Sequence, residues 1–231
     1  MRKEKITVFV DESYSDDYAS VAAVVVQSED NRQVVATALK KLFLKPEFIT
    51  TSKGSLHYQE EGVGARQVVS TLIRQIPVSA YIAFTQLDVP RDKISQDELV
   101  YGTLLPKLLT ATLQKYKKHS ADYSVEIIFE NLTDHIIKDE KYFKSKFATL
   151  AGKHNFKITV KTKNTEPLLS LPDYFLGFVR NVVLQSNGAT WPNQLFELVA
   201  DKFGVILEYG IDINRYNRGE GEKFLGAYRR K

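Results

Sequence analysis

The chain of 231 residues has no cysteine, one methionine, one tryptophan and four histidines. The absence of cysteine excludes disulfide bonds, thiolate zinc sites and a cysteine nucleophile, and it is typical of a reducing compartment. Long apolar runs are also missing. The first residues, MRKEKITVFVDES, have only about five apolar positions in a row, too few for a signal peptide or a membrane span. We therefore expect a soluble, cytoplasmic protein without membrane association.

The composition is that of a folded globular chain, with 43% hydrophobic and 26% charged residues. This length suits one large domain with an appended region. We predict a core domain over residues 1–185 and an extension over residues 186–231, packed on the core and ending in a flexible basic tail.

Basic residues gather in two stretches, although the net charge is only +4. Residues 138–163 include eight lysines, and residues 215–231 include six basic side chains. Such clusters can follow a phosphate backbone, and they are also typical of solvated helix faces. The nucleic-acid contacts that we predict are Lys141, Lys144, Lys146 and Lys153.

Hydrophobic patterning predicts an α/β fold. The first two strands are close enough to form an antiparallel hairpin, and later strands alternate with helices, which predicts parallel pairing through right-handed crossovers. A five-stranded mixed sheet flanked by helices follows, with a kink at Pro106 in the third helix. The expected strands are 6–10, 19–27, 78–87, 124–130 and 156–163, and the expected helices are 31–44, 65–76, 97–116, 138–153 and 171–184.

Acidic residues follow directly on two of these strands. Asp11 and Glu12 come after the first strand, and Glu130 ends the fourth. If these strands are parallel neighbours, their ends lie about 5 Å apart, at the edge where open α/β sheets hold ligands. Asp173 opens the last core helix, and Gly177 would let that helix approach the sheet.

Each of these acids also has a structural interpretation. Asp11 could begin a turn, Glu130 could simply end a strand, and Asp173 is favoured by the helix dipole in a first turn. Clustered carboxylates repel one another unless cations offset their charge. Oxygen ligands without cysteine favour Mg²⁺ or Mn²⁺. Two such ions about 4 Å apart can hydrolyse a phosphodiester.

The irregular stretch at residues 55–64 adds weaker candidates. His57 could carry a proton or bind metal, and Glu60 or Glu61 could be a further ligand. A lone histidine in such a stretch is more often a surface or hydrogen-bonded residue.

Four motifs together resemble the domain-of-unknown-function family numbered 3800 (DUF3800). They are VFVDES at residues 8–13, Leu56-His57, IIFE at residues 127–130 and LLSLPDY at residues 168–174. The resemblance implies a ribonuclease H-like fold in which the first and fourth strands are neighbours. It also implies a metal-dependent nuclease, of a kind often associated with mobile elements and phage defence.

Carried over by position, the resemblance makes Asp11, Glu130 and Asp173 metal ligands. It makes Glu12 a supporting acid and His57 a group that assists proton transfer. The chain departs from the family pattern at four positions: Ser55 replaces a common acid, Tyr14 a glycine, Pro172 an alanine and Glu130 an aspartate.

Other functions remain open from the residues alone. A nucleic-acid-binding protein without catalysis would keep the basic stretches and need no metal. A sugar-kinase-like phosphotransferase would need a glycine-rich phosphate loop, whereas the first hairpin turn reads YSDDY. A scaffold role, a protein partner or a homo-oligomer stays possible, and no motif distinguishes DNA from RNA.

Overall fold

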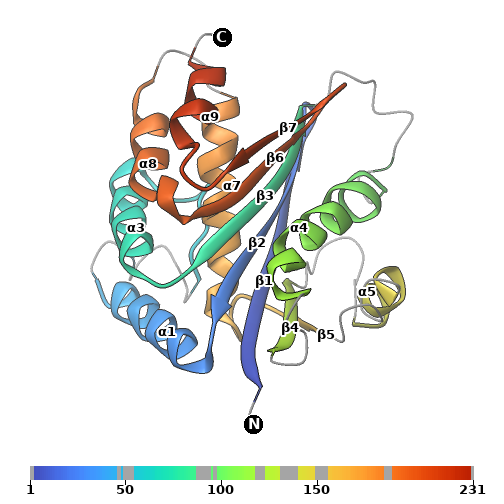
Figure 1. Cartoon of the computed structure of the whole chain (residues 1–231). Helices are drawn as coiled ribbons and strands as arrows, with labels where there is room; N and C mark the ends of the chain where they lie inside the picture. Colours follow the sequence, from blue (N-terminus) through green and yellow to red (C-terminus); the bar gives the residue numbers. More distant parts are fainter. Residues whose placement is uncertain are drawn as a thin grey trace.

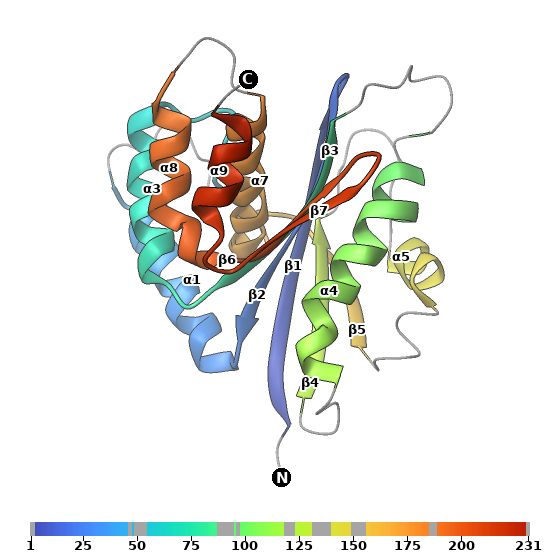
Figure 2. The ribbon, with the colours of Figure 1, turned by 45° about the horizontal axis from the view of Figure 1, so that its top comes forward.

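The computed structural model describes residues 3–45, 48, 55–86, 95, 98–117, 123–130, 140–148, 156–184 and 189–229. The described residues form a mixed β-sheet with helices on both faces (Figures 1 and 2). The strands are β1 (Glu4–Ser15), β2 (Tyr18–Gln27), β3 (Ser79–Gln86), β4 (Tyr123–Glu130), β5 (Phe156–Lys161), β6 (Phe203–Tyr209) and β7 (Ile213–Asn217).

The order of the strands is β5-β4-β1-β2-β3-β6-β7. As predicted, β1 and β2 form an antiparallel hairpin, and β1 and β4 are parallel neighbours, as the resemblance to the DUF3800 family implied. Strand β5 is parallel to β4, but β3 pairs antiparallel with β2, so the expected parallel pairing after the hairpin is wrong for β3. The sheet has seven strands, so the predicted count of five is wrong. The apolar segment after residue 203 pairs in parallel with β3, and β7 folds back on it in an antiparallel hairpin.

Helices cover the two faces of the sheet unequally (Figure 2). One face, here called the α7 face, packs against α1 (Glu29–Phe43), α3 (Val63–Gln75), α7 (Ser170–Val183), α8 (Trp191–Val199) and α9 (Gly221–Tyr228). The opposite face, here called the α4 face, packs against a π-helix (Glu98–Leu104), α4 (Leu105–Lys117) and α5 (Glu140–Lys146). Short 3₁₀ turns lie at Pro167–Leu169 and Ala200–Lys202.

The third predicted helix changes its type close to Pro106. A π-helical segment ends at Leu104, and the regular α-helix α4 starts at Leu105. Proline lacks a backbone N–H and is best accommodated in a first helical turn, which is where Pro106 lies in α4. The sequence predicted a kink at Pro106. What the structure shows close to this residue is a change from π-helical to α-helical hydrogen bonding.

Residues near the C-terminus are ordered, so the prediction of a flexible tail is wrong for the described part up to residue 229. Helix α9 buries Phe224, Leu225 and Tyr228, and Phe224 packs edge-on against Phe84 of β3. Burying these rings removes a large apolar area from water.

The described part of the chain has no helix that is both long and apolar enough to cross a membrane.

Candidate active site

Two of the predicted acids meet at the C-terminal end of β4. Strand β1 continues to Ser15, but its pairing with β4 ends at Val10 and Phe129. The next residue on each strand is an acid, Asp11 on β1 and Glu130 on β4. Side chains alternate between the faces of a sheet. Asp11 lies on the α7 face because its pairing partner Ala22 belongs to that core, and Glu130 shares this face because it lies two residues after Ile128.

The third acid comes from above this face. Asp173 lies in the first turn of α7, where the helix dipole favours a negative charge. The three carboxylates converge on Lys163, in the turn that follows β5. Its Nζ atom lies 2.9 Å from Glu130 Oε2, 3.3 Å from Asp11 Oδ2 and 3.6 Å from Asp173 Oδ2. We call these four residues the acid–lysine cluster.

The acid–lysine cluster is sheltered from water. Asp11 is 4% exposed and Lys163 8%. Burial raises the pKa of Glu130 to about 8, and the charge of Asp11 adds to this effect while Lys163 opposes it. Burial also raises the pKa of Asp173, against the attraction of Lys163. For Lys163 burial alone would lower the pKa, but the charges of the three acids outweigh it and raise the pKa.

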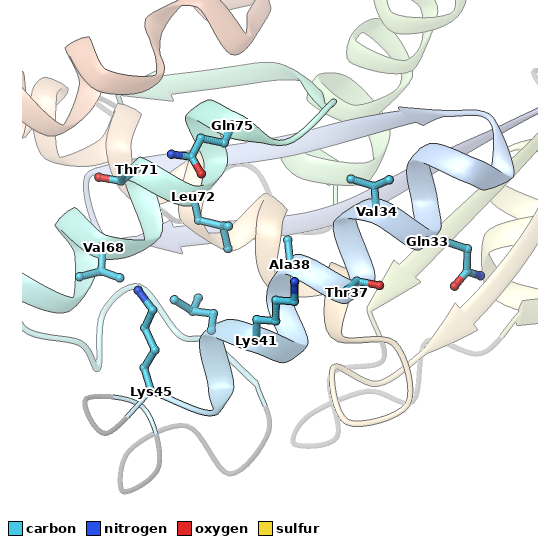
Figure 3. Close-up of a pocket in the computed structure, with 11 residues that line it drawn as sticks. Gln33, Val34, Thr37, Ala38, Lys41, Lys45, Val68, Thr71, Leu72 and Gln75 are labelled. Atoms are coloured by element: carbon cyan, nitrogen blue, oxygen red, sulfur yellow. The ribbon is translucent and has the colours of Figure 1, made fainter.

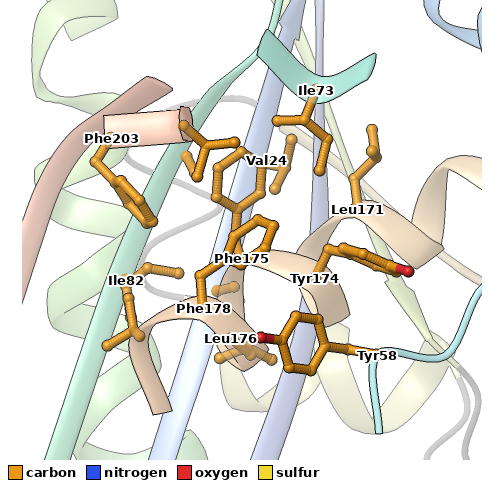
Figure 4. Packing of buried hydrophobic residues seen from close by; sticks show 14 of the residues in the cluster. Val24, Tyr58, Ile73, Ile82, Leu171, Tyr174, Phe175, Leu176, Phe178 and Phe203 are labelled. Carbon is orange, nitrogen blue, oxygen red and sulfur yellow. The ribbon is translucent and has the colours of Figure 1, made fainter. Parts of the chain in front are cut away.

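Tyr58 holds the segment after residue 54 against α7. The Tyr58 ring is buried and makes edge-on contacts with Tyr174 and Phe178 of α7 (Figure 4). Its backbone N–H donates to Asp173 Oδ2 at 3.2 Å. A Cβ atom at Gly177 would lie 2.2 Å from the Tyr58 ring. Gly177 therefore makes room for a tyrosine, whereas the sequence had suggested a closer approach of α7 to the sheet.

His57 reaches the acid–lysine cluster at its open side. Its Nδ1 atom is 3.8 Å from Asp173 Oδ2, and its Nε2 atom is 3.1 Å from Ser55 Oγ. The neighbouring residues Leu56 and Tyr58 are both buried, so they hold the backbone while the imidazole stays half-buried. His57 therefore lies beside the acid–lysine cluster, and its role in proton transfer stays a prediction.

The contact order Ser55, His57, Asp173 is also that of a serine hydrolase triad. An acyl-transfer site needs free N–H donors for the oxyanion. Here the N–H groups of the three residues after Ser55 donate to Ser170 Oγ, Glu61 Oε1 and Asp173 Oδ2. The loop that carries the serine thus has its nearest donors occupied, and Ser55 itself is buried. The arrangement therefore does not favour an acyl-transfer site. Ser55 and Asp173 instead hold the imidazole of His57 in place.

Of the two adjacent glutamates, the buried one faces the site. Glu60 is exposed, which does not support its assignment as a metal ligand. Glu61 is 6% exposed, accepts a hydrogen bond from the backbone of His57 through Oε1, and has no hydrogen-bond partner at Oε2 among the described residues. Burial raises the pKa of Glu61 to about 7, and the nearby charge of Asp173 contributes. A buried carboxylate oxygen without a partner is costly unless a cation or water completes it.

Glu12 does not belong to the acid–lysine cluster. It directly follows Asp11 in a continuous strand, so its side chain lies on the α4 face, opposite Asp11. There it accepts a hydrogen bond from the Tyr101 hydroxyl of the π-helix. The assignment of Glu12 as a supporting acid is therefore wrong in position.

The three described lysines of the predicted nucleic-acid contacts lie on the α4 face. Lys141, Lys144 and Lys146 are exposed on α5, whose Phe143 packs in the core of that face. Lys144 pairs with Glu140, and Lys146 lies 3.7 Å from Glu98. Lys153 lies outside the described residues. These side chains are on the other face of the sheet from Asp11, and whether they bind nucleic acid stays a prediction.

A groove of about 790 Å³ lies between α1 and α3, away from the acid–lysine cluster (Figure 3). Its floor is aliphatic, with Ala38 and Leu42 on α1 opposite Val68 and Leu72 on α3. Among the described residues that line it, Lys41 and Lys45 are charged and none is an acid or a histidine. The groove therefore combines apolar surface with two lysines, and the described lining supplies no carboxylate or imidazole.

Sequence reasoning missed Lys163, the residue around which the acids gather. It stands two residues beyond β5, as Glu130 stands at the end of the neighbouring strand β4, and that parallel position was the available signal. Within the described residues, no three acidic or histidine side chains are arranged to hold a metal ion as they stand. The carboxylates are arranged around an ammonium group instead.

Comparison with models of known protein families gives no match for this chain, and no curated protein matches it either.

Proposed function

We propose that this protein is a metal-dependent nuclease of the ribonuclease H-like class, which hydrolyses phosphodiester bonds of DNA or RNA. The observation that carries the proposal is the gathering of Asp11, Glu130 and Asp173 within 3.6 Å of one ammonium nitrogen. Asp11 lies more than a hundred residues from the other two acids in the sequence, and nothing in local structure requires the three to meet. Buried carboxylates repel one another, which costs stability, so a cluster of them is typical of a functional site.

The donor set suits a hard divalent cation. Asp11, Glu130 and Asp173 supply carboxylate oxygens, and Glu61 adds a buried oxygen to which no described residue donates a hydrogen bond. Mg²⁺ and Mn²⁺ prefer such ligands, and no cysteine competes for a softer metal. When bound, one or two such ions would activate water and stabilise the leaving oxygen of the phosphodiester.

The protein's own groups have separate tasks in this proposal. In the metal-free protein, Lys163 offsets part of the negative charge and keeps the carboxylates together. His57, held between Ser55 and Asp173 but half-buried, can accept a proton at the site and release it to solvent. The backbone N–H of Tyr58 orients Asp173.

The fold supports the same class of enzyme. The ribonuclease H-like fold implied by the resemblance to the DUF3800 family places the first and fourth strands side by side, and β1 and β4 are parallel neighbours. Strands β6 and β7 then extend the sheet beyond β3. A role in a mobile element or in phage defence rests on the resemblance alone.

Cleavage assays with labelled DNA and RNA test the proposal. We expect cleavage with Mg²⁺ or Mn²⁺ that is lost on chelation and falls by at least about a hundredfold in Asp11→Asn, since loss of a ligand removes the charge that positions the ions. Glu60→Gln is the matched control, because Glu60 is exposed and should leave the rate unchanged. Equal rates in Asp11→Asn and the native protein would contradict the catalytic assignment.

A second function is favoured by the ammonium group between the carboxylates. A protein in which Lys163 permanently occupied the centre of the three carboxylates would bind no metal there and would bind nucleic acid without cutting it. Thermal denaturation distinguishes the two, because Mn²⁺ raises the melting temperature only of a protein that binds it. No shift with Mn²⁺, together with intact nucleic acid in the cleavage assay, would favour the binding protein.

A further inference from the structure

We propose that Lys163 is an internal counter-cation which holds the acid site in shape without metal, and that it leaves its place among the carboxylates when a divalent cation binds. The inference rests on the proposed function, since it assigns a role to one residue of the same site. Lys163 would then be a positioning residue that also sets the affinity of the site for metal.

The first argument is one of geometry. The Nζ atom of Lys163 lies 2.9–3.6 Å from one oxygen of each of three carboxylates. A cation that bridges the same oxygens needs distances of about 2.1 Å and the same central volume. Ammonium and metal therefore cannot occupy the centre together, and the side chain of Lys163 must move if a metal enters.

The second argument is one of charge. Three buried carboxylates against one ammonium would leave the site at −2 if all the acids were ionised. A divalent cation in place of the ammonium carries one more positive charge and therefore offsets more of this excess.

The third argument concerns the backbone that carries the lysine. Residues 162–166 form a turn in which the N–H groups of Thr165 and Glu166 donate to the carbonyl of Thr162. The buried Glu166 carboxylate is held by Arg32 and Lys161. The turn is thus fixed independently of Lys163. Its four-carbon side chain can leave the carboxylates without unfolding the segment.

Calorimetric titration with Mn²⁺ alone, without nucleic acid, tests the exchange. We expect Lys163→Met to bind Mn²⁺ about tenfold more tightly than the native protein, because binding no longer requires ion pairs to be broken. The metal-free variant should also melt several degrees lower than the native protein, about 5 °C.

Lys161→Met is the matched control. Lys161 precedes Lys163 by two residues, but it pairs with Glu166 and makes no ion pair with the three acids. The Lys161→Met substitution removes the same charge from the same region, so the Mn²⁺ affinity of this variant should equal that of the native protein. A similar gain in both variants would reduce the effect to net charge and overturn the role of Lys163.

A second measurement follows Lys163 in the native protein, so its result does not depend on the stability of Lys163→Met. The ammonium of Lys163 is buried and hydrogen-bonded, which slows its proton exchange and makes its nitrogen observable by NMR in the native protein. The signal is assigned by its loss in Lys163→Arg. We expect saturating Mg²⁺ to shift or abolish the Lys163 signal while that of Lys161 stays in place.

The outcomes separate this inference from the proposed function. Native protein that takes up no Mn²⁺ or Mg²⁺ would overturn both. Native protein that binds metal, with no gain in affinity in Lys163→Met and an unchanged Lys163 signal, would overturn the exchange alone and leave the metal site standing.

Discussion

Gly177 illustrates how one residue can decide whether the site assembles. It lies one turn after Asp173 in α7, and the ring of Tyr58 occupies the space where a side chain would be. The same tyrosine donates its backbone N–H to Asp173. The missing side chain of Gly177 therefore connects the core of the protein with the geometry of the carboxylates.

Gly177→Ala should destabilise the protein by about 1–3 kcal/mol, since the added methyl group overlaps a buried ring that must move. Displacement of Tyr58 should also loosen residues 55–61, with faster hydrogen exchange there. Chemical denaturation and hydrogen exchange measure the two effects.

Gly226→Ala is the control for helix propensity. Gly226 is an exposed glycine of α9, and nothing lies within 4 Å of an added Cβ atom. Alanine should be neutral or stabilise the helix by up to about 1 kcal/mol there. Equal effects of the two substitutions would show that the contact with Tyr58 is unimportant.

Adjacent acids in a strand show what a residue pattern can and cannot determine. Once residues 4–15 form one strand, alternation alone places Asp11 and Glu12 on opposite faces. The sequence suggested that the strand ended before Asp11, which left both acids free to point the same way. The continued pairing with β2 corrects this, and only Asp11 belongs to the site.

At the scale of elements, Glu126 connects the three strands at one edge of the sheet. It lies on β4, accepts hydrogen bonds from Lys157 and Thr159 of β5, and pairs with Lys5 of β1. Burial alone would raise its pKa, but these hydrogen bonds and charges outweigh burial and lower the pKa below the ordinary value of 4.5.

Glu126→Gln should therefore destabilise the protein at neutral pH by roughly 1 kcal/mol or less, as is usual for partly screened ion pairs. A lowered folded-state pKa means that the stabilisation is present above pH 4.5 and is lost as the pH falls through the lower, folded value. The difference between native protein and variant should shrink in that window.

Urea denaturation of both proteins from pH 7 to pH 3 measures this difference. Thr159→Val, which removes one of the hydrogen bonds, should weaken the pH dependence in the native background and have no pH-dependent effect in Glu126→Gln. A constant difference across the range would contradict the lowered pKa.

For the whole molecule, the described part of the C-terminal region completes the sheet and the core. Strand β6 pairs with β3, and α9 covers Phe84 on the α7 face. Without these residues β3 would be an exposed edge strand with large apolar side chains, an arrangement that promotes aggregation. A domain boundary near residue 185 stays a prediction.

A chain that ends at residue 185 should not fold cooperatively, because it loses both the pairing of β3 and the aromatic contacts of α9. A chain that ends at residue 229 retains β6, β7 and α9 and should unfold like the full chain. Thermal denaturation followed by circular dichroism, with solubility as a second readout, compares the two. Cooperative unfolding of the shorter chain would support an independent core domain.

The sequence by itself determined the α/β class, the first hairpin and the candidates Asp11, Glu130 and Asp173, because these follow from hydrophobic periodicity and from the positions of acids at strand and helix ends. That β1 and β4 are neighbours was implied only by the family resemblance. Only the tertiary structure decided that seven strands pair, that Glu12 faces away and that Lys163 joins the acids. The physical reason is distance along the chain. In the sequence, a lysine in a turn looks like a solvated charge. Only folding brings residues more than a hundred positions apart against it, and burial then strengthens the electrostatic interaction of its ammonium with the carboxylates.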